Sequence, residues 1–150
     1  MELDNNSSHM SEDYDLQIIN TIPYYESFHN ETLNIIKVIS DKPNIWLDTG
    51  CGIGTLIQKA FEEFEIINFI LVDPSEKMLN KARSKLSKHP QERLKFLEPS
   101  ETGKISLKGD YKPDVITAIQ AHHYMTKKNR FTLLKAKVWE NLVKGVWWMP

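Results

Sequence analysis

One stretch of the chain constrains the fold more than any other. The apolar residues 45–47 are typical of a buried strand, and glycines follow at alternate positions, Gly50, Gly52 and Gly54. Apolar residues then recur at helical spacing from Leu56 onward. Glycine lets the chain turn tightly and lets a ligand lie against bare backbone, and the helix start behind the turn offers unpaired N–H groups. The sequence therefore predicts the first strand, turn and helix of an α/β nucleotide-binding fold.

The spacing of the glycines separates two classes of ligand. A dinucleotide-binding turn has Gly-x-Gly-x-x-Gly or Ala, but the third position falls here on Thr55 or Ile57. The chain instead has Asp-x-Gly-x-Gly-x-Gly, in which Asp48 closes the strand. This pattern resembles motif I of the class I S-adenosylmethionine-dependent methyltransferases and disfavours a nicotinamide-dependent oxidoreductase. A tight turn that binds no ligand is the structural alternative.

A second apolar run, 66–72, predicts a strand of a parallel sheet that is covered on both faces. The run ends at Asp73, where a carboxylate could accept hydrogen bonds from two ribose hydroxyls. Asp73 could also simply start the next helix, and the two roles are compatible. Residues 72–79 resemble the family's second motif, which implies that Pro74 and Met78 help to enclose the adenine.

The third strand is predicted at 93–97. Many members of the family carry an acidic residue shortly after this strand, where it holds the adenine amino group. Here that position holds Ser100, between Glu98 and Glu101. We therefore expect Ser100 or its backbone to make the adenine contact.

The fourth strand is predicted at 114–120, next to the first strand at the point where the strand order reverses. Gln120 is therefore a candidate cofactor ligand. His122 and His123 are candidate catalytic residues, one of them as a general base, although both could also serve packing and hydrogen bonding. Adjacent side chains diverge and no further ligand cluster accompanies them, so we expect no metal site.

The segment before the first strand predicts a helix at 30–39, which would flank the cofactor cleft in this family. Tyr24 and Tyr25 precede it. Aromatic faces suit a sulfonium cation, but packing is the favoured interpretation of both tyrosines.

The resemblance implies an α/β, Rossmann-like, doubly wound parallel sheet. The family's sheet normally has seven strands, whereas this chain provides about five, so we expect a C-terminally truncated domain over 14–150. Residues 146–149 would form the fifth strand as an exposed edge, and we expect self-association through it. Residues 1–13 are polar and are expected to be a disordered tail or a cloning remnant.

The resemblance also implies a reaction, the transfer of a methyl group from S-adenosylmethionine to an acceptor. Asp48 would organise the glycine turn and hold the amino end of the methionine, the three glycines would admit the cofactor to the backbone, and Asp73 would bind ribose. The Asn-Pro-Pro-Tyr motif of base-methylating enzymes is absent after the fourth strand, which points to a small-molecule acceptor. The alternative is a cofactor-binding module without turnover.

Composition limits the remaining possibilities. A chain of 150 residues with 41% hydrophobic residues predicts one domain with a real core. A formal net charge of −1 argues against nucleic-acid or membrane binding by bulk charge. No apolar run is long enough to span a bilayer, and the single Cys51 excludes an internal disulfide, so we expect a cytoplasmic protein.

Overall fold

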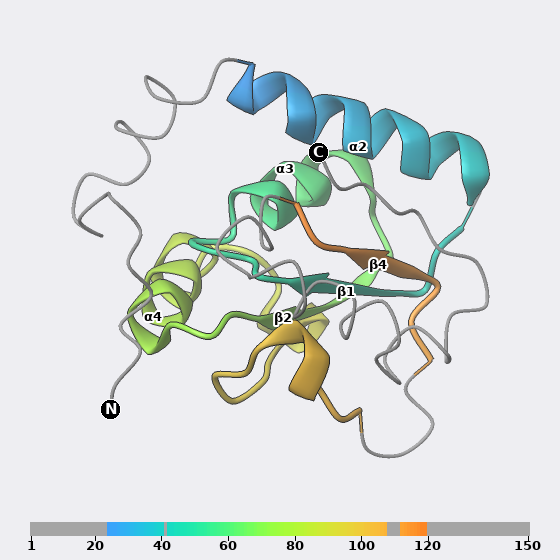
Figure 1. The fold of residues 1–150 in the computed structure, drawn as a ribbon. Coiled ribbons are helices and arrows are strands. Elements are labelled where there is room, and N and C mark those ends of the chain that lie inside the picture. Colours follow the sequence, from blue (N-terminus) through green and yellow to red (C-terminus); the bar gives the residue numbers. More distant parts are fainter. Residues whose placement is uncertain (1–23, 41, 108–111, 120–150) are drawn as a thin grey trace.

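The computed structural model describes residues 24–40, 42–107 and 112–119, and its centre is a four-stranded, all-parallel sheet (Figure 1). The strand order is β3-β2-β1-β4, so the order reverses between β1 and β4. This confirms the predicted α/β, Rossmann-like fold; the fifth strand and the edge expected at 146–149 lie outside the described residues. The strands are β1 (Ile45–Thr49), β2 (Asn68–Val72), β3 (Leu94–Phe96) and β4 (Val115–Thr117).

Helix α2 begins at Tyr25 and not at Asn30, where the sequence predicted its start. Its buried face consists of His29, Leu33 and Ile36, and the first of these is polar, so hydrophobic periodicity does not reveal the first turn. None of the described helices is long and apolar enough to cross a bilayer. The helices are α2 (Tyr25–Ile39), α3 (Thr55–Glu63), α4 (Glu76–Lys85), and the short 3-10 helices η1 (Gln91–Arg93) and η2 (Thr102–Lys104).

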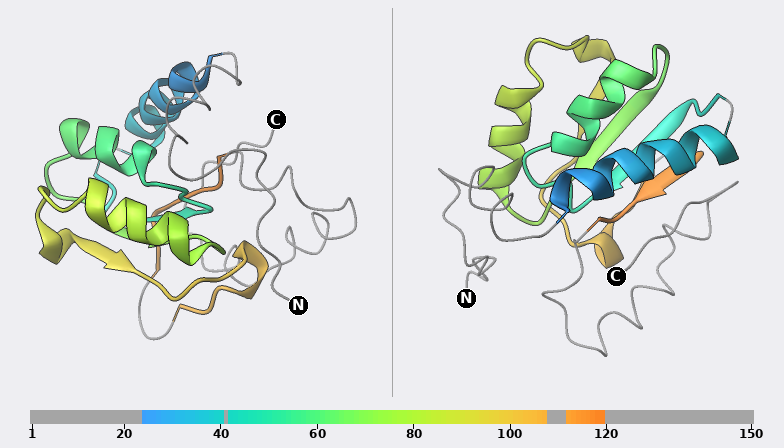
Figure 2. Two further views of the ribbon diagram at one scale, coloured as in Figure 1. Left: turned by 90° about the vertical axis from the view of Figure 1, so that its left-hand side faces the viewer. Right: turned by 90° about the horizontal axis from the view of Figure 1, so that it is seen from above.

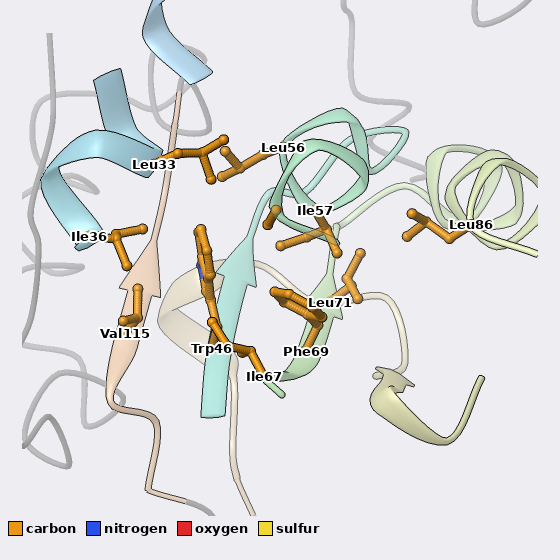
Figure 3. Close-up of a cluster of buried hydrophobic side chains, with 11 residues drawn as sticks. Leu33, Ile36, Trp46, Leu56, Ile57, Ile67, Phe69, Leu71, Leu86 and Val115 are labelled. Carbon is orange, nitrogen blue, oxygen red and sulfur yellow. The ribbon is translucent and has the colours of Figure 1, made fainter. Parts of the chain in front are cut away.

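Side chains alternate across the sheet, so apolar residues collect on both faces. The face that carries Trp46 and Phe69 packs against α2, α3 and the end of α4, which form one layer (Figures 2 and 3). The opposite face is covered by the segment after β3. The larger cluster contains Leu33, Ile36, Trp46, Leu56, Ile57, Ala60, Ile67, Phe69, Leu71, Leu86 and Val115. The smaller cluster contains Leu47, Ile70, Val72, Ile105 and Ile116.

The parallel register brings the carboxyl ends of three strands to one edge of the sheet. Asp48 pairs with Leu71 of β2 and with Thr117 of β4, and Thr49 pairs with Val72. Open α/β sheets bind ligands outside this edge, where the strand order reverses. A ligand site is therefore expected among the side chains and turns that follow β1, β2 and β4.

The side chain of Arg93 joins the C-terminal end of α3 to the sheet. The sequence placed Arg93 in the third strand, but it belongs to η1 and is half-buried. Its guanidinium donates from Nε to the carbonyl of Ile67 at 2.8 Å and from Nη2 to the carbonyl of Phe64 at 3.0 Å. It also lies over the ring of Phe61, with 4.7 Å between Cζ and the ring centroid. One planar cation thus joins the end of α3 to the start of β2.

Candidate functional site

The glycine turn connects β1 to α3 and is fastened to the end of β2. Gly50, Gly52 and Gly54 have φ values of 66°, 54° and 79°, a region that residues with a Cβ rarely adopt. The amides of Gly50 and Cys51 both donate to the carbonyl of Val72, at 2.8 and 3.1 Å. The turn is therefore a preformed backbone loop that lies against the tip of the neighbouring strand.

The glycines at positions 52 and 54 face different surroundings. A Cβ added at Gly54 would lie 3.1 Å from Leu86 Cδ1 and 3.3 Å from Ala82 Cβ, whereas a Cβ added at Gly52 would meet no atom within 4 Å. Gly54 thus allows close packing of the turn against α4. Gly52 instead leaves open space beside the turn, which a ligand could occupy.

Asp73 holds the glycine turn in place from the tip of β2. Its carboxylate is 5% exposed and accepts from the amide of Gly52 at Oδ2 (2.9 Å) and from the amide of Ser75 at Oδ1 (2.8 Å). Burial raises the pKa of Asp73, and the two backbone hydrogen bonds oppose that rise. Each carboxylate oxygen has a second lone pair, so two ligand hydroxyls could still donate to this group. The contact with ribose stays a prediction.

Three other predicted ligands lie around the same strand tip. Pro74 is exposed directly after Asp73, and Met78 is half-buried in the first turn of α4, where its amide donates to Ser75 Oγ at 3.4 Å. The amide of Ser100 donates to the carbonyl of Asp73 at 3.2 Å, so the loop after β3 continues along the end of β2. The structure therefore brings these residues together, and their contact with adenine stays a prediction.

Asp48 has a different partner from the one expected. The carboxylate bonded to the glycine turn belongs to Asp73, whereas Asp48 accepts a 2.6 Å hydrogen bond from Thr117 Oγ1 across to β4. Burial raises the pKa of Asp48 to about 7; the bond from Thr117 lowers it and the negative charge of Asp73 raises it further. Near neutral pH this carboxyl group can therefore exchange between its neutral and its ionised form.

Thr117 and the indole of Trp46 are the site residues that sequence reasoning missed. The indole Nε1 donates to Thr117 Oγ1 at 2.8 Å, so one hydroxyl links the core to Asp48. The available signal was weak: a threonine between apolar residues on a buried strand must find a partner for its hydroxyl. Which partner it finds is decided only by the sheet register.

Cys51 lies in the glycine turn and is half-buried. Burial and the negative charges of Asp48 and Asp73 raise the pKa of its thiol well above the ordinary range. A thiol held in its neutral form is a poor nucleophile, so Cys51 is not suited to nucleophilic catalysis.

A groove of about 340 Å³ lies between α2 and the end of β4. Tyr24 lines it and is 78% exposed, whereas Tyr25 packs edge-on against the ring of His29, with 4.6 Å between ring centroids. Thr117 also lines the groove, so the groove reaches the residue that bonds Asp48. The lining residues are Tyr24, Ser27, Phe28, Glu31, Thr32, Ile35, Thr117, Ala118 and Ile119.

Three predicted site residues, Gln120, His122 and His123, lie outside the described residues. Within the described ranges, no group of three or more histidine, cysteine, aspartate or glutamate side chains is arranged to hold a metal ion.

The sequence profile of a family described as "Methyltransferase domain" matches residues 47–145, about two thirds of the chain. No curated protein sequence matches the chain. Similar solved structures include DesVI of Streptomyces venezuelae, with 18% identity, a TM-score of 0.67, and 100% of this chain covering 60% of that one.

The N-methyltransferase NodS of Bradyrhizobium japonicum WM9, solved with S-adenosylhomocysteine, is 14% identical with a TM-score of 0.66, and the match covers 85% of this chain and 60% of that one. The magnesium protoporphyrin IX methyltransferase ChlM of Synechocystis PCC 6803, solved with bound S-adenosylmethionine, is 14% identical with a TM-score of 0.64, over 79% of this chain and 55% of that one. At these identities the structural matches establish the fold. The chain spans about 60% of the length of the first of these structures.

Proposed function

This chain belongs to the methyltransferase domain family, and from that premise we propose that it binds S-adenosylmethionine and transfers the methyl group to a small-molecule acceptor. The observation that carries the proposal is the open space at Gly52 beside the buried carboxylate of Asp73. A bare backbone turn next to a carboxylate at a strand tip suits an adenosyl ligand, because the turn admits the ligand and the carboxylate accepts from its ribose.

The residues of the β2 tip would bind the adenosine part of the ligand. Asp73 would accept from the ribose hydroxyls, and Pro74, Met78 and Ser100 would border the adenine. The position of these four residues around one strand end supports this assignment.

Asp48 would hold the amino group at the methionine end of the ligand. It lies on β1, one strand away from Asp73, and ionised carboxylates favour positively charged partners. When bound, S-adenosylmethionine supplies a methyl group on a sulfonium whose thioether is already a good leaving group, so the protein has mainly to hold the acceptor in line and exclude water.

The acceptor would approach from the groove between α2 and β4. The groove has the size of a small-molecule site, and it reaches Thr117, the hydrogen-bond partner of Asp48. A net charge of −1 gives no support for a nucleic-acid acceptor. Gln120 comes three positions after the end of β4 and would contact the cofactor. His122 or His123 would serve as general base for an acceptor that must lose a proton.

The test separates binding from turnover. Isothermal titration with S-adenosylhomocysteine should show one site, and a panel of small-molecule acceptors should give acceptor-dependent formation of S-adenosylhomocysteine. Binding without turnover across a broad panel would favour the cofactor-binding module. Tighter binding of NAD than of S-adenosylhomocysteine would overturn the proposal.

A further inference from the structure

A chain of buried hydrogen bonds leads from the apolar core to Asp48. Trp46 Nε1 donates to Thr117 Oγ1 at 2.8 Å, and Thr117 Oγ1 donates to Asp48 Oδ1 at 2.6 Å. Thr49 Oγ1 adds a hydrogen bond to the carbonyl of Thr117 at 3.2 Å. All four residues are at most 3% exposed. The hydroxyl of Thr117 is therefore held in place from β1 on both of its sides.

The chemistry of these groups determines the direction of the chain. An indole N–H can only donate, so Trp46 must use a lone pair of the Thr117 hydroxyl. The hydroxyl has one proton, and the geometry directs that proton to Asp48. Asp48 therefore accepts at Oδ1, and this donation favours its ionised form.

We propose that Thr117 is a positioning residue that holds Asp48 as an ionised acceptor for the positively charged α-amino group of the cofactor's methionine end. This inference rests on the proposed function, since it needs a ligand with such an amine. An ionised carboxylate has about four acceptor positions and Thr117 uses one of them, so others remain for the ligand. A carboxylate whose orientation is set in advance needs no rearrangement on binding.

The charges around Asp48 make the hydroxyl of Thr117 important. Asp73 on β2 carries the negative charge that disfavours ionisation of Asp48, and the thiol of Cys51 lies in the turn between them. On α2, the titratable groups of the groove that Thr117 lines are Tyr24 and Glu31. None of these groups is a cation, so the donation from Thr117 opposes both burial and repulsion.

Removal of the hydroxyl should therefore change the pH dependence of ligand binding. Without the donation, Asp48 keeps its proton to a higher pH, and the neutral acid holds a cationic amine less well. A Thr117 that served only the packing of the strand would change stability but would leave the pH dependence of binding where it is. The two roles thus have different experimental signatures.

The experiment is a titration of the full chain with S-adenosylhomocysteine between pH 5.5 and 9, for the unchanged protein and three variants. Thr117→Val removes the hydroxyl and keeps the shape, and Thr117→Ser keeps the hydroxyl. The double variant W46F/T117V removes the indole donor as well, so no buried N–H is left without an acceptor if Thr117→Val alone does not fold.

We expect about tenfold weaker binding at pH 7 for Thr117→Val and W46F/T117V, and a rise of about one pH unit in the pH at which binding strengthens. Thr117→Ser should bind within about threefold of the unchanged protein. Valine variants that fold and bind with an unchanged pH profile would overturn the inference while leaving the proposed function standing. If the unchanged protein binds no S-adenosylhomocysteine at any pH, both fall together.

Discussion

At the scale of single residues, two residues of the same type in similar positions have different roles because their surroundings differ. Gly52 and Gly54 both have positive φ values, yet one faces open space and the other faces Ala82 and Leu86. Asp48 and Asp73 both lie at the carboxyl end of a strand, yet one accepts from a hydroxyl on β4 and the other accepts from two backbone amides. The function of each residue thus depends on what lies opposite its side chain.

Alanine at the two glycines should separate stability from binding. Gly54→Ala should lower the free energy of unfolding by about 3 kcal/mol, because backbone strain adds to the contacts with Leu86 and Ala82. Gly52→Ala should cost only the strain, about 1 kcal/mol, but should weaken S-adenosylhomocysteine binding at least about tenfold. Urea denaturation and isothermal titration measure the two effects. If Gly52→Ala destabilised the protein as much as Gly54→Ala and left binding unimpaired, the assignment of Gly52 to the ligand site would be wrong.

The raised pKa of Asp48 predicts a specific dependence of stability on pH. Because the folded protein keeps the proton of Asp48 up to about pH 7 and the unfolded chain releases it near 3.8, the folded state binds more protons in that interval. Stability contributed by Asp48 therefore falls as the pH rises from about 4 to 7, by at most about 4 kcal/mol.

The control for this prediction is Asp48→Asn, which cannot ionise and can still accept from Thr117. Denaturation curves from pH 4 to pH 8 should show similar stabilities at pH 4 and a more stable variant at pH 8. Asp73 is present in both proteins, so its own titration largely cancels in the difference. Parallel profiles over the whole range would show that Asp48 does not titrate as inferred.

At the scale of elements, a few side chains join helices and strands that apolar packing brings near one another. Asp114 accepts from the amides of Asn44 and Ile45, at 2.8 and 2.9 Å, and so ties the start of β1 to the residue before β4. Arg93 does the same for the end of α3 and the start of β2. Hydrogen bonds are directional and apolar packing is not, so these side chains fix the relative positions of the elements more narrowly than the apolar layer does.

Substitution of Arg93 should weaken the joint between α3 and β2. Arg93→Lys keeps the charge but loses the planar fork that reaches the carbonyls of Phe64 and Ile67, and we expect a loss of about 1–2 kcal/mol in the free energy of unfolding. The control is Arg83→Lys, because Arg83 pairs with Glu76 at the surface and its side chain is 41% exposed. That change should stay within about 0.5 kcal/mol. Equal losses in the two variants would show that the hydrogen bonds of Arg93 do not stabilise the contact between α3 and β2.

At the scale of the whole molecule, the candidate site consists of parts that are distant in the sequence. The β1 turn, the β2 tip and the end of β4 meet at one sheet edge, and α2 adds the groove wall beside β4 (Figure 1). The cofactor would then enter over the glycine turn, and the acceptor would enter along α2.

A bulky residue in the groove should separate acceptor binding from cofactor binding. Ser27 lines the groove on α2, and Ser27→Trp should raise the KM of an identified acceptor at least about tenfold while leaving S-adenosylhomocysteine affinity within about twofold. Glu26→Trp places the same bulk on an exposed position of the same helix that does not line the groove, and it should change neither quantity. An unchanged KM for Ser27→Trp would place the acceptor elsewhere.

Much of this arrangement follows from the sequence alone. Alternate glycines after an apolar run, and acids at the ends of two such runs, predicted the turn, the parallel sheet and the candidate positions from Asp48 to Met78, because strand periodicity and glycine conformation are local properties. The early start of α2 was missed, since its first buried residue is the polar His29.

The tertiary structure decided which group meets which. Only the register between β1 and β4 places Thr117 opposite Asp48, and only the packing of α4 distinguishes Gly54 from Gly52. These assignments depend on contacts between residues that are 28 to 69 positions apart, and no local pattern encodes such contacts. The kinds of residue at the site were therefore readable from the chain, whereas the pairing of carboxylates, hydroxyls and open space arose from the fold.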